Sequence, residues 1–594
     1  MVCGPQLSPM LWLGCMKIWI PIILLAIFTN ACTTETPVDA RDDQAVKTGK
    51  ADSSVDECSH DQVVVMLNEF TTDADFLKSS GVHTQAANHL AAYRAGEDEL
   101  RGTEDDIFFN GIHEVDAVPY VGPVAMEALI ASVEDRCPII KTHEVVFSPQ
   151  PYGDSHLQKT IDLIDAAHSS LDIAMYSFRD HSLLDALARA RDRGISIRAI
   201  LESARKDRND PEGTISALVE ELGIDVVWVN KIMHHKFVII DGPREYLFDG
   251  YEGILVTGSG NWSYSAGTKY DESTLIIRGN GELLLRFQRE FNLLWAHARD
   301  FVWVEDLFSF DSMAIAEEAI VDEPTSEALF TSANFKTSVT SYGPTFSIES
   351  GKNEISDRMV ELINEAENSI HIASGHMRLR PVYEALIARH EADPEMDIRV
   401  YLDAQEYVSL WGQEKQVAKQ QLCLEDAGDS ESKKQKCLDR GFRYSYALHQ
   451  AGIDLRFKYY SYRWHYSYAV QMHHKYMVVD GHTVAMGSYN LSDNAEHNTF
   501  ENLIILQGDS HAELSEAFET NFEGMWSTGE SEGLFESLLV EVDSGPTGFP
   551  MVFQSMALDW DQVTELKSRM RERCPQIDSE AFYSNPASHH WCTP

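Results

Sequence analysis

One eleven-residue pattern occurs twice in this chain of 594 residues. The first copy is 232-IMHHKFVIIDG-242 and the second is 471-QMHHKYMVVDG-481. Each copy combines two adjacent histidines, a lysine, an apolar run and Asp-Gly. Two copies of one pattern that are separated by the length of a domain indicate duplication of one folded unit, so the chain is expected to contain two similar domains.

The segments before each copy support this duplication, because helical and strand patterns alternate in the same order. Apolar spacing and alternation predict these elements. Before the first copy we expect helices at 155–170 and 181–194 and strands at 171–178 and 195–203; before the second, helices at 354–368 and 381–392 and strands at 369–377 and 397–404. Alternating strands and helices predict an α/β fold with a largely parallel or mixed sheet.

Polar residues downstream of both copies also recur in one order. His234, Lys236 and Asp241 precede 258-GSGNWS-263 and Glu272, whereas His473, Lys475 and Asp480 precede 487-GSYNLS-492 and Glu501. Asparagine and glutamate are 11 residues apart in both copies, while histidine and asparagine are 27 and 17 residues apart. The additional residues lie near 243–253, where we expect a longer hairpin. Matched positions of this kind exclude coincidence.

The pattern H-x-K-x-x-x-x-D followed by G-S-x-N resembles the signature of the phospholipase D superfamily. The resemblance covers roughly residues 143–530. It implies two tandem phospholipase D-like α/β/α sandwich domains, related by a pseudo-two-fold axis. It also implies that both motifs meet in one active site, that of a phosphoric diester hydrolase.

Paired histidines suit cleavage of a phosphodiester in two displacements without a metal or other cofactor. One neutral imidazole attacks phosphorus and forms a covalent phosphohistidine. The other protonates the leaving alcohol and then activates water, and imidazole has a pKa suited to both tasks. The resemblance implies that His234 is the nucleophile and His473 the general acid and base.

The other repeated residues are expected to support this chemistry. Lys236, Lys475, Asn261 and Asn490 would stabilise charge on the phosphoryl oxygens, with Ser259 and Ser488 assisting through their hydroxyls. By the resemblance, Glu272 orients His234 and Glu501 orients His473, although exchanged partners remain open. Asp241 and Asp480, each before glycine at a strand end, are interpreted as structural turn residues. His235 and His474 point away from the catalytic face of a strand and are interpreted as bystanders, not metal ligands.

The N-terminus has the pattern of an export signal. Residues 16-MKIWIPIILLAIFTNAC-32 combine a basic start, a short apolar run and small residues before Cys32. We interpret Met16 as the true start, residues 1–32 as a signal peptide and residues 33–55 as a polar linker. Cys32 resembles the cysteine of a bacterial lipoprotein box, so both lipidation at Cys32 and cleavage after Ala31 remain open. The expected location is outside the cell or on the outer envelope of a bacterium.

Six cysteines follow this segment, an even number that suggests disulfides in an oxidising compartment. Pairing of neighbours is one possible connectivity, and would join Cys58 to Cys137, Cys423 to Cys437 and Cys574 to Cys592.

The rest of the chain divides by composition. Residues 56–138 are expected to form a small helical domain, in which 112–133 resembles half of a helix-hairpin-helix module. Tyr120 replaces the usual turn glycine, and basic residues are scarce, so a structural or protein-docking role is favoured over DNA binding. We expect the α/β domains at 143–300 and 346–530, a linker at 301–345, an insertion at 405–445 and an acidic, cysteine-bearing cap at 531–594.

Charge and aromatic content bear on the substrate. The formal net charge of −46 opposes binding of a phosphate backbone. The segment 457-FKYYSYRWHYSY-468 mixes aromatic and basic residues in a manner typical of a membrane interface. We therefore predict an enzyme that cleaves phospholipid headgroups at a membrane surface. The alternatives are an endonuclease acting on DNA or RNA and a non-catalytic envelope protein that binds a phosphate ligand. No obligate protein partner is expected, because one chain carries both motifs.

Overall fold

The computed structural model describes residues 57–571, except for 70, 97, 99, 102, 104, 134–135, 137–141, 302–312, 342, 440, 462–467 and 546–551. The expected signal peptide, Cys32 and the linker 33–55 lie outside the described residues. So do Cys137, Cys574, Cys592, the side chain of Cys58 and the middle of the aromatic segment 457–468. Within the described part of the chain, no helix is long and apolar enough to span a membrane.

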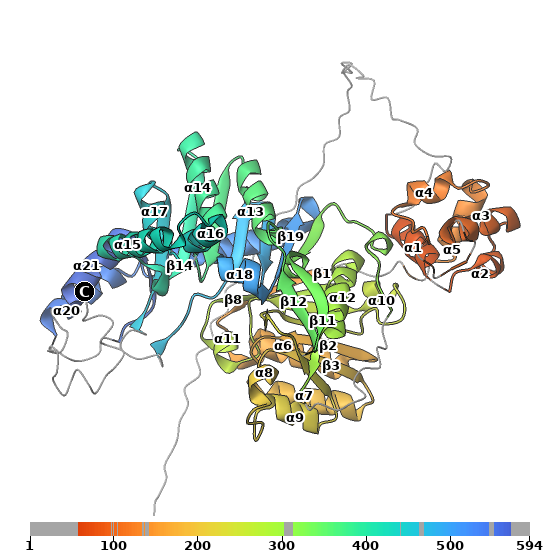
Figure 1. Ribbon diagram of the computed structural model, residues 1–594, viewed down its shortest axis with the longest axis horizontal. Helices are drawn as coiled ribbons and strands as arrows, with labels where there is room; N and C mark the ends of the chain where they lie inside the picture. Colours follow the sequence, from red (N-terminus) through yellow and green to blue (C-terminus); the bar gives the residue numbers. More distant parts are fainter. Residues whose placement is uncertain are drawn as a thin grey trace, which may run out of the picture. The chain divides into compact units, whose positions relative to one another are not determined.

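The first α/β domain is built on an eight-stranded mixed sheet (Figure 1). Its strand order is β1 (Thr142–Ser148), β8 (Glu272–Arg278), β7 (Ile254–Gly258), β6 (Lys236–Ile240), β2 (Ser170–Met175), β3 (Ser196–Leu201), β4 (Asp225–Trp228) and β9 (Arg299–Asp300). The parallel neighbours in this sheet are β2 with β3 and β3 with β4, and the other neighbouring strands pair antiparallel. Helices α6 (His156–Ala166), α7 (His181–Asp192) and α9 (Ile215–Glu221) share an apolar core with one face of this sheet, and α12 (Gly281–Ala296) packs on the other.

The second domain repeats this plan. Its sheet has the order β10 (Ser326–Phe330), β19 (Asn502–Gln507), β17 (Thr483–Gly487), β16 (Lys475–Val479), β13 (Ser369–Ser374), β14 (Asp397–Asp403), β15 (Asp454–Tyr459) and β20 (Met556–Asp559). Helices α13 (Glu354–Glu365), α14 (Arg380–Ala392) and α17 (Ser445–Gln450) pack on one face, and α19 (Ala512–Trp526) on the other. The α/β class and the tandem arrangement predicted from the sequence are confirmed.

One apolar core joins the two domains. It contains Phe287 and Phe291 of α12, Phe518 and Phe522 of α19, and inward-facing residues of both sheets, such as Phe237. Because helix and strand faces from both domains are buried together, the interface has the character of a single domain's interior. This core fixes the position of one motif relative to the other.

Several short elements connect the strands. They are β5 (Ile232–Met233), β18 (Thr499–Phe500), α8 (Ala204–Asp207), α10 (Asp249–Glu252), α11 (Tyr264–Thr268) and α18 (Asp493–Asn498). The expected long hairpin near 243–253 joins the antiparallel strands β6 and β7 and contains α10.

The expected linker at 301–345 is wrong for its described part. Strand β10 pairs antiparallel with β19 and completes the second sheet, and β11 (Phe335–Thr340) forms a hairpin with β12 (Gly343–Ile348). The apolar run of β10 is only Ala-Leu-Phe. A strand this short is stabilised by its partner strand, so its sequence pattern alone is weak.

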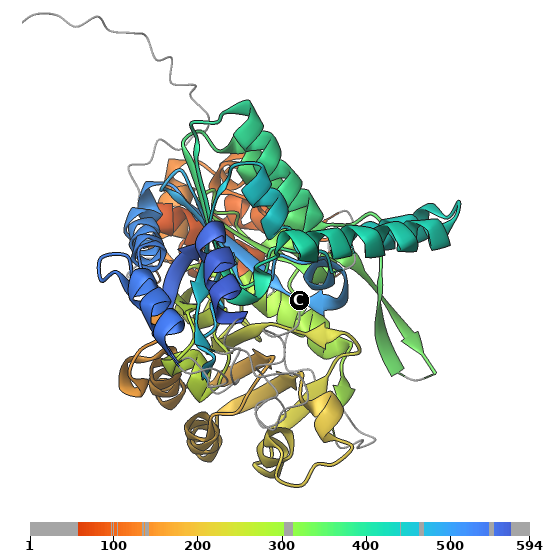
Figure 2. The same ribbon diagram turned by 90° about the vertical axis from the view of Figure 1, so that its left-hand side faces the viewer.

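The insertion at 405–445 contains two helices, α15 (Leu410–Ala427) and α16 (Glu431–Asp439), drawn in teal in Figure 2. The Cys423–Cys437 disulfide joins them, as the pairing of neighbours predicts. In the C-terminal region, β20 extends the second sheet beside β15, and α20 (Leu534–Ser544) and α21 (Trp560–Arg571) pack against its core.

The N-terminal region forms five helices within its described residues, namely α1 (Glu57–Asn68), α2 (Ala74–Ser79), α3 (Thr84–Arg94), α4 (Ile112–Ala117) and α5 (Pro123–Ala131). Tyr120 lies in the turn between α4 and α5 and has a φ of 70°. The turn therefore adopts the left-handed conformation that favours glycine, at a cost of about 1 kcal/mol for a residue with a Cβ.

Candidate active site

Backbone pairing between the domains brings the two motifs together. Strand β5, just before His234, pairs in parallel with β18 of the second domain. The N–H of His234 donates to the carbonyl of Phe500 at 3.0 Å, and the N–H of His473 donates to the carbonyl of Asp271 at 3.0 Å. Each motif histidine is thus anchored to the opposite domain by its own backbone.

Each motif histidine also pairs with the glutamate of the opposite domain. The Nδ1 atom of His234 lies 2.8 Å from Oε2 of Glu501, and Nδ1 of His473 lies 2.8 Å from both carboxylate oxygens of Glu272. The sequence-based assignment of Glu272 to His234 and Glu501 to His473 is therefore wrong, and the exchanged pairing that it left open is present. The cause is geometric. Phe500 and Asp271 accept the backbone N–H of the opposite domain's motif histidine, and Glu501 and Glu272 are the next residues along the chain.

The motif serines hold strands and glutamates in place. The Ser488 hydroxyl donates to Oε2 of Glu501 at 2.7 Å and accepts the N–H of Asn502 at 3.0 Å. Ser259 accepts the N–H of Ser273 at 2.9 Å in the equivalent place. Both serines are fully buried, so the expected direct assistance at the phosphoryl group is replaced by a supporting position behind it.

The glycine before each serine is required by close packing. A Cβ on Gly258 would lie 2.2 Å from the carbonyl oxygen of Ser273, and a Cβ on Gly487 would lie 2.3 Å from that of Asn502. A side chain at either position would separate the serine from its neighbouring strand. This explains the Gly-Ser pair in both motifs.

Burial dominates the electrostatics of the two histidine–glutamate pairs. It lowers the pKa of His234 and His473 well below the ordinary value, and the motif lysines lower it further. Burial also raises the pKa of Glu272 and Glu501 to about 7, although the lysines oppose this. Because the two members of each pair lie 2.8 Å apart, their protonation states are coupled.

The two lysines are held in the same way as each other. Nζ of Lys236 donates to the carbonyl of His234 at 2.6 Å, and Nζ of Lys475 donates to that of His473 at 2.7 Å. Burial lowers the pKa of Lys236 to about 7 and that of Lys475 to about 8. An anion such as a phosphodiester would restore the charged form of both lysines, so the site is built to receive one.

A cleft of about 640 Å³ contains both motif histidines. Other residues on its wall include Tyr176, Arg378, Asn490 and Glu501. Asn261 is the pseudo-symmetric counterpart of Asn490, and its backbone carbonyl lies 3.0 Å from Nε2 of the buried His156. The fold thus brings both histidines to one cavity, with one motif asparagine on its wall.

Asp241 and Asp480 are placed in turns. The carboxylate of Asp241 accepts the backbone N–H groups of Ser169 at 2.7 Å and Ser170 at 3.1 Å, and Asp480 accepts that of Ser369 at 2.9 Å. Both aspartates have positive φ angles, of 52° and 53°. Their side chains tie the end of the motif strand to the start of the neighbouring strand.

Two carboxylates that the sequence argument did not single out support the motif backbones. Glu202 accepts the N–H of Met233 at 2.8 Å, and Asp403 accepts the N–H of Met472 at 3.0 Å. Each is the second-last residue of the second expected strand of its domain (195–203 and 397–404), so comparison of the two repeats at that position would have found them. Each fixes the residue immediately before a motif histidine.

The second histidines of the two H-H-K sequences have different surroundings. Nε2 of His235 lies 3.1 Å from Oε1 of Glu290, and its Nδ1 lies 3.0 Å from the Asn502 amide. The sequence shows no carboxylate at ligand spacing, and the tertiary structure supplies Glu290 from α12. His474 is also fully buried and packs against the rings of Phe147 and Tyr476. Both histidines belong to the core between the domains.

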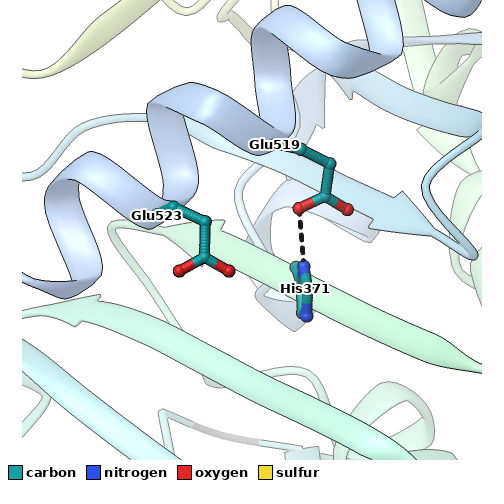
Figure 3. A group of neighbouring side chains, drawn as sticks. All are labelled: His371, Glu519 and Glu523. Atoms are coloured by element: carbon teal, nitrogen blue, oxygen red, sulfur yellow. Dashed lines mark hydrogen bonds and ion pairs between the residues drawn. The ribbon is translucent and has the colours of Figure 1, made fainter.

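A second histidine–glutamate group lies on α19 and β13, where His371, Glu519 and Glu523 come within 4.8 Å of one another (Figure 3). The Arg399 guanidinium joins two members of the group, since its Nη2 lies 2.7 Å from Nε2 of His371 and 2.7 Å from Oε1 of Glu523. In the first domain the corresponding place on β2 and β3 is the buried ion pair of Asp172 with Arg198. The group is best explained as an ion-pair network that joins sheet and helix, rather than as a metal site.

A family model described as "Cardiolipin synthase, PLD-like domain" matches residues 160–295 and 359–526, about half of the chain. The chain belongs to the phospholipase D superfamily. As a phosphodiesterase of the phospholipase D type, it carries both histidine motifs on one polypeptide, one in each matched segment.

Parts of this chain are similar in sequence to known proteins. This phospholipase D-type chain is 26% identical over 215 residues to the mitochondrial cardiolipin hydrolase of Drosophila melanogaster, an alignment covering 34% of this chain and 79% of the relative. It is 29% identical over 147 residues to the human mitochondrial cardiolipin hydrolase, covering 24% of this chain and about half (53%) of that protein.

Two solved structures are also similar. Nuc, a phospholipase D family member from Salmonella typhimurium, shows 25% identity and a TM-score of 0.23, with 27% of this chain and 98% of Nuc covered. The phosphatidylserine synthase of Haemophilus influenzae Rd KW20 shows 12% identity and a TM-score of 0.43, with 64% of this chain and 85% of that chain covered.

Proposed function

We propose that this protein is an exported phosphodiesterase that cleaves headgroups from phospholipids through a covalent phosphohistidine, without a metal ion. The observation that carries the proposal is the exchanged histidine–glutamate pairing in one cleft. In each pair the carboxylate engages Nδ1 of the imidazole, so Nε2 is the nitrogen that remains for chemistry.

In the first step, Nε2 of His234 attacks phosphorus and forms a P–N bond. The bond from phosphorus to the headgroup oxygen breaks, and that oxygen takes its electron pair and a proton from Nε2 of His473. Lys236 and Lys475 stabilise the extra negative charge on the phosphoryl oxygens, with Asn490 and Asn261 as amide donors. The role of each histidine follows the family resemblance.

In the second step, water replaces the headgroup. His473, now neutral, accepts a proton from water while the water oxygen attacks phosphorus. The P–N bond breaks and its electron pair returns to His234. The products are phosphatidate and a restored pair of imidazoles, so no other reactant is needed.

Three observations favour phospholipid as the substrate and an exported location. The curated relatives described above are named cardiolipin hydrolases. The net charge of −46 disfavours nucleic acid. The N-terminal signal pattern and the disulfide between Cys423 and Cys437 agree with an oxidising, extracytoplasmic compartment.

The test compares substrates in EDTA. The mature protein is incubated with phosphatidylcholine or cardiolipin vesicles and, separately, with single-stranded DNA. Release of choline or phosphatidate without nicking is expected. Nicking alone would replace the proposal with the endonuclease alternative, and loss of activity in EDTA would contradict the metal-free mechanism.

The matched variants are His234→Ala, His473→Ala and His235→Ala. The first two should each lose at least about a thousandfold in kcat, because each removes a group that forms or breaks a bond. His235→Ala is the control, because it removes a buried imidazole that has no proposed role in catalysis. Thermal unfolding is measured for this variant together with the other two. Full activity in either of the first two variants would refute the mechanism.

A further inference from the structure

The two halves of the cleft differ in what lies beside each motif histidine. The N–H of Tyr176, after β2, donates to the carbonyl of His235 at 2.9 Å, and the N–H of Gly375, after β13, donates to that of His474 at 3.2 Å. Tyr176 and Gly375 are therefore pseudo-symmetric counterparts. The Tyr176 ring stands edge-on to the His234 ring with a centroid distance of 4.4 Å, whereas Gly375 borders a cavity of about 170 Å³. The two domains thus present different side chains at equivalent places.

A larger difference lies farther out, where three arginines of the first domain surround one buried tryptophan. The guanidinium carbons lie 5.9, 5.2 and 5.1 Å from the centre of the Trp228 ring for Arg205, Arg208 and Arg299, respectively. At these distances an aromatic face attracts a cation. Arg205 is exposed and the other two arginines are half-buried, so a ligand from solvent can reach them.

Two of these arginines have no counter-ion within the described part of the chain. Nη1 of Arg205 and Nη2 of Arg299 donate to the backbone carbonyls of Asn230 and Pro344, at 3.4 and 2.9 Å, and neither side chain forms an ion pair with a residue that the structure describes. Burial lowers the pKa of Arg299, and the charges of Arg205 and Arg208 lower it further. The three positive charges therefore repel one another.

Nearby carboxylates are engaged elsewhere or lie on another face. Asp207, on α8, accepts the Ser216 hydroxyl at 2.6 Å. Burial raises the pKa of Glu202 to about 7, and the charge of Arg205 offsets this only in part. Asp300 is the second residue of β9, and the alternation of a strand places it on the face opposite to its neighbour. In a chain with a net charge of −46, arginines grouped in this way are an exception.

The second domain builds the same place without arginines. Trp228 and Phe457 are the fourth residues of β4 and β15, which occupy equivalent positions in their sheets. Trp228 pairs with Arg299 on β9, whereas Phe457 pairs with Leu558 on β20 and is fully buried in the apolar core. The fold of this unit therefore does not require a cation there.

The charge contributed by α8 is also absent from the second domain. Glu202 and Asp403 are equivalent, and three residues later the first domain has Arg205 and the second has Glu406. Glu406 accepts a hydrogen bond from Nε of Arg378 at 3.0 Å. The charge at this place is thus neutralised inside the protein in the second domain but not in the first.

The cluster lies at the same end of the first sheet as the catalytic cleft. The carbonyl of Asn230, which accepts from Arg205, is two residues before Ile232 on the cleft wall. The helix α8 begins just after Glu202, whose carboxylate holds the N–H of Met233 at 2.8 Å. In α/β sheets, ligands bind beyond the carboxyl ends of parallel strands such as β3 and β4. A group bound by the arginines would therefore lie beside the cleft, outside it.

The chemistry of the cluster suits an oxyanion. A guanidinium donates from its edge in a fork that matches phosphate oxygens, and stacking on a ring occupies its face instead. We infer that Arg205, Arg208 and Arg299 form a phosphate-binding site outside the catalytic cleft, which takes the phosphate group of an anionic phospholipid next to the substrate. The lipid source of the phosphate rests on the proposed function, whereas the binding of a phosphate group does not.

The test measures binding in the His234→Ala background, so that no lipid is cleaved. The protein is sedimented with vesicles of phosphatidylcholine, with or without phosphatidate, at roughly 0.15 M salt, where charges more than about 8 Å away are screened. We expect tighter binding to the vesicles with phosphatidate. The double variant Arg205→Gln/Arg299→Gln should weaken that binding about tenfold or more, because two cations near an anionic surface are lost.

Two further double variants serve as controls. Arg191→Gln/Arg193→Gln removes the same charge from α7 and its C-cap, where both arginines also donate to backbone carbonyls, and should weaken binding less than about threefold. Arg205→Lys/Arg299→Lys keeps the charges and should retain more of the binding than the glutamine variant. Thermal unfolding of every variant identifies any loss of folding.

Two titrations identify the source of the phosphate. Inorganic phosphate and single-stranded DNA are each titrated by calorimetry into the cluster variant Arg205→Gln/Arg299→Gln and into the α7 control. If the cluster variant binds one phosphate fewer but keeps its vesicle binding, the site stands and its ligand is free phosphate. If it loses only DNA binding, the lipid is overturned in favour of a nucleic acid.

The site and the proposed function can fail separately. A cluster variant that matches the α7 control with vesicles, phosphate and DNA would overturn the inference. Headgroup release by the wild-type protein is measured on its own. A wild type that releases no headgroup, together with a cluster variant that loses vesicle binding, would refute the proposed function and leave the phosphate site standing.

Discussion

The exchanged pairing of histidine and glutamate makes a prediction for Glu501→Gln. Oε2 of Glu501 accepts hydrogen bonds from His234 and Ser488, while Oε1 accepts one from the Thr499 hydroxyl at 2.8 Å. Glutamine can keep its oxygen at the Oε2 position and turn its NH₂ group toward Thr499, whose oxygen can accept. The variant should therefore preserve the tautomer of His234 and lose only the negative charge.

The size of the effect follows from the strength of a charged hydrogen bond. A hydrogen bond to a charged group contributes about 1.5–3 kcal/mol and a neutral one about 0.5–1.5, so the loss is about 1–2 kcal/mol. At roughly 1.4 kcal/mol for each factor of ten, attack by His234 should slow about 5- to 30-fold. If the NH₂ group instead faced Nδ1, the wrong tautomer would be selected and the loss would approach about ten-thousandfold, as in a serine protease triad.

The assay isolates one step. With bis(4-nitrophenyl) phosphate the leaving group needs no proton, so the first-turnover release of 4-nitrophenol, measured by stopped flow, reports attack by His234 alone. Glu501→Gln should slow this burst. Glu272→Gln, which alters the partner of His473, should leave the burst within about twofold and slow the following hydrolysis. Glu290→Gln changes the buried partner of His235 and serves as the matched control, with an unchanged burst.

The opposite pattern would refute the reasoning. A burst slowed by Glu272→Gln and spared by Glu501→Gln would mean either that the in-domain pairing operates during catalysis or that His473 is the nucleophile. Trapping the phosphohistidine and locating it by mass spectrometry would separate these two explanations.

Three other predictions concern stability and charge. Burial would raise the pKa of Asp480, but the backbone N–H groups that donate to its carboxylate outweigh burial and lower the pKa below its ordinary value of 3.8. Asp480→Ala should therefore lower the free energy of unfolding, measured in urea at pH 7, by about 1–3 kcal/mol. The difference between variant and wild type should shrink below pH 4, because the carboxylate is then protonated. Replacing Cys423 and Cys437 with serine removes a link across 14 residues and should destabilise α15 and α16 locally by about 3 kcal/mol, seen as faster hydrogen exchange confined to 405–445; unchanged exchange would contradict this. The pKa values of Lys236 and Lys475 are about 7 and 8, so both lysines are partly neutral at pH 8 and should take up protons when vanadate binds. Calorimetry in buffers of different ionisation enthalpy measures this proton uptake. Proton release on binding would contradict the lowered lysine pKa values.

Local patterns were sufficient for the repeated elements. The helices and strands around β2, β3, β13 and β14 follow from apolar periodicity, and the two motifs follow from spacing along the chain. The disulfide between Cys423 and Cys437 was also predictable, since the two cysteines are close in sequence and flank one turn of an insertion. These features depend on residues near one another in the chain.

Other features depend on contacts across the whole molecule. Strand β10 is stabilised by β19, far away in sequence, so its short apolar run gave too weak a signal. Glu290 reaches His235 only because α12 packs against the interface between the domains. The supporting carboxylates Glu202 and Asp403 become evident once the strands that carry them lie beside the motif backbones.

The amino-acid sequence by itself determined that there are two α/β units and that their histidines, lysines, asparagines and glutamates form matched sets. Only the tertiary structure decided which glutamate holds which histidine, because the parallel pairing of β5 with β18 exchanges them between domains. It also decided that the two halves are unequal. Tyr176 and Gly375 occupy equivalent backbone positions, but a side chain fills space on one side alone, so a symmetric pair of motifs encloses an asymmetric cleft.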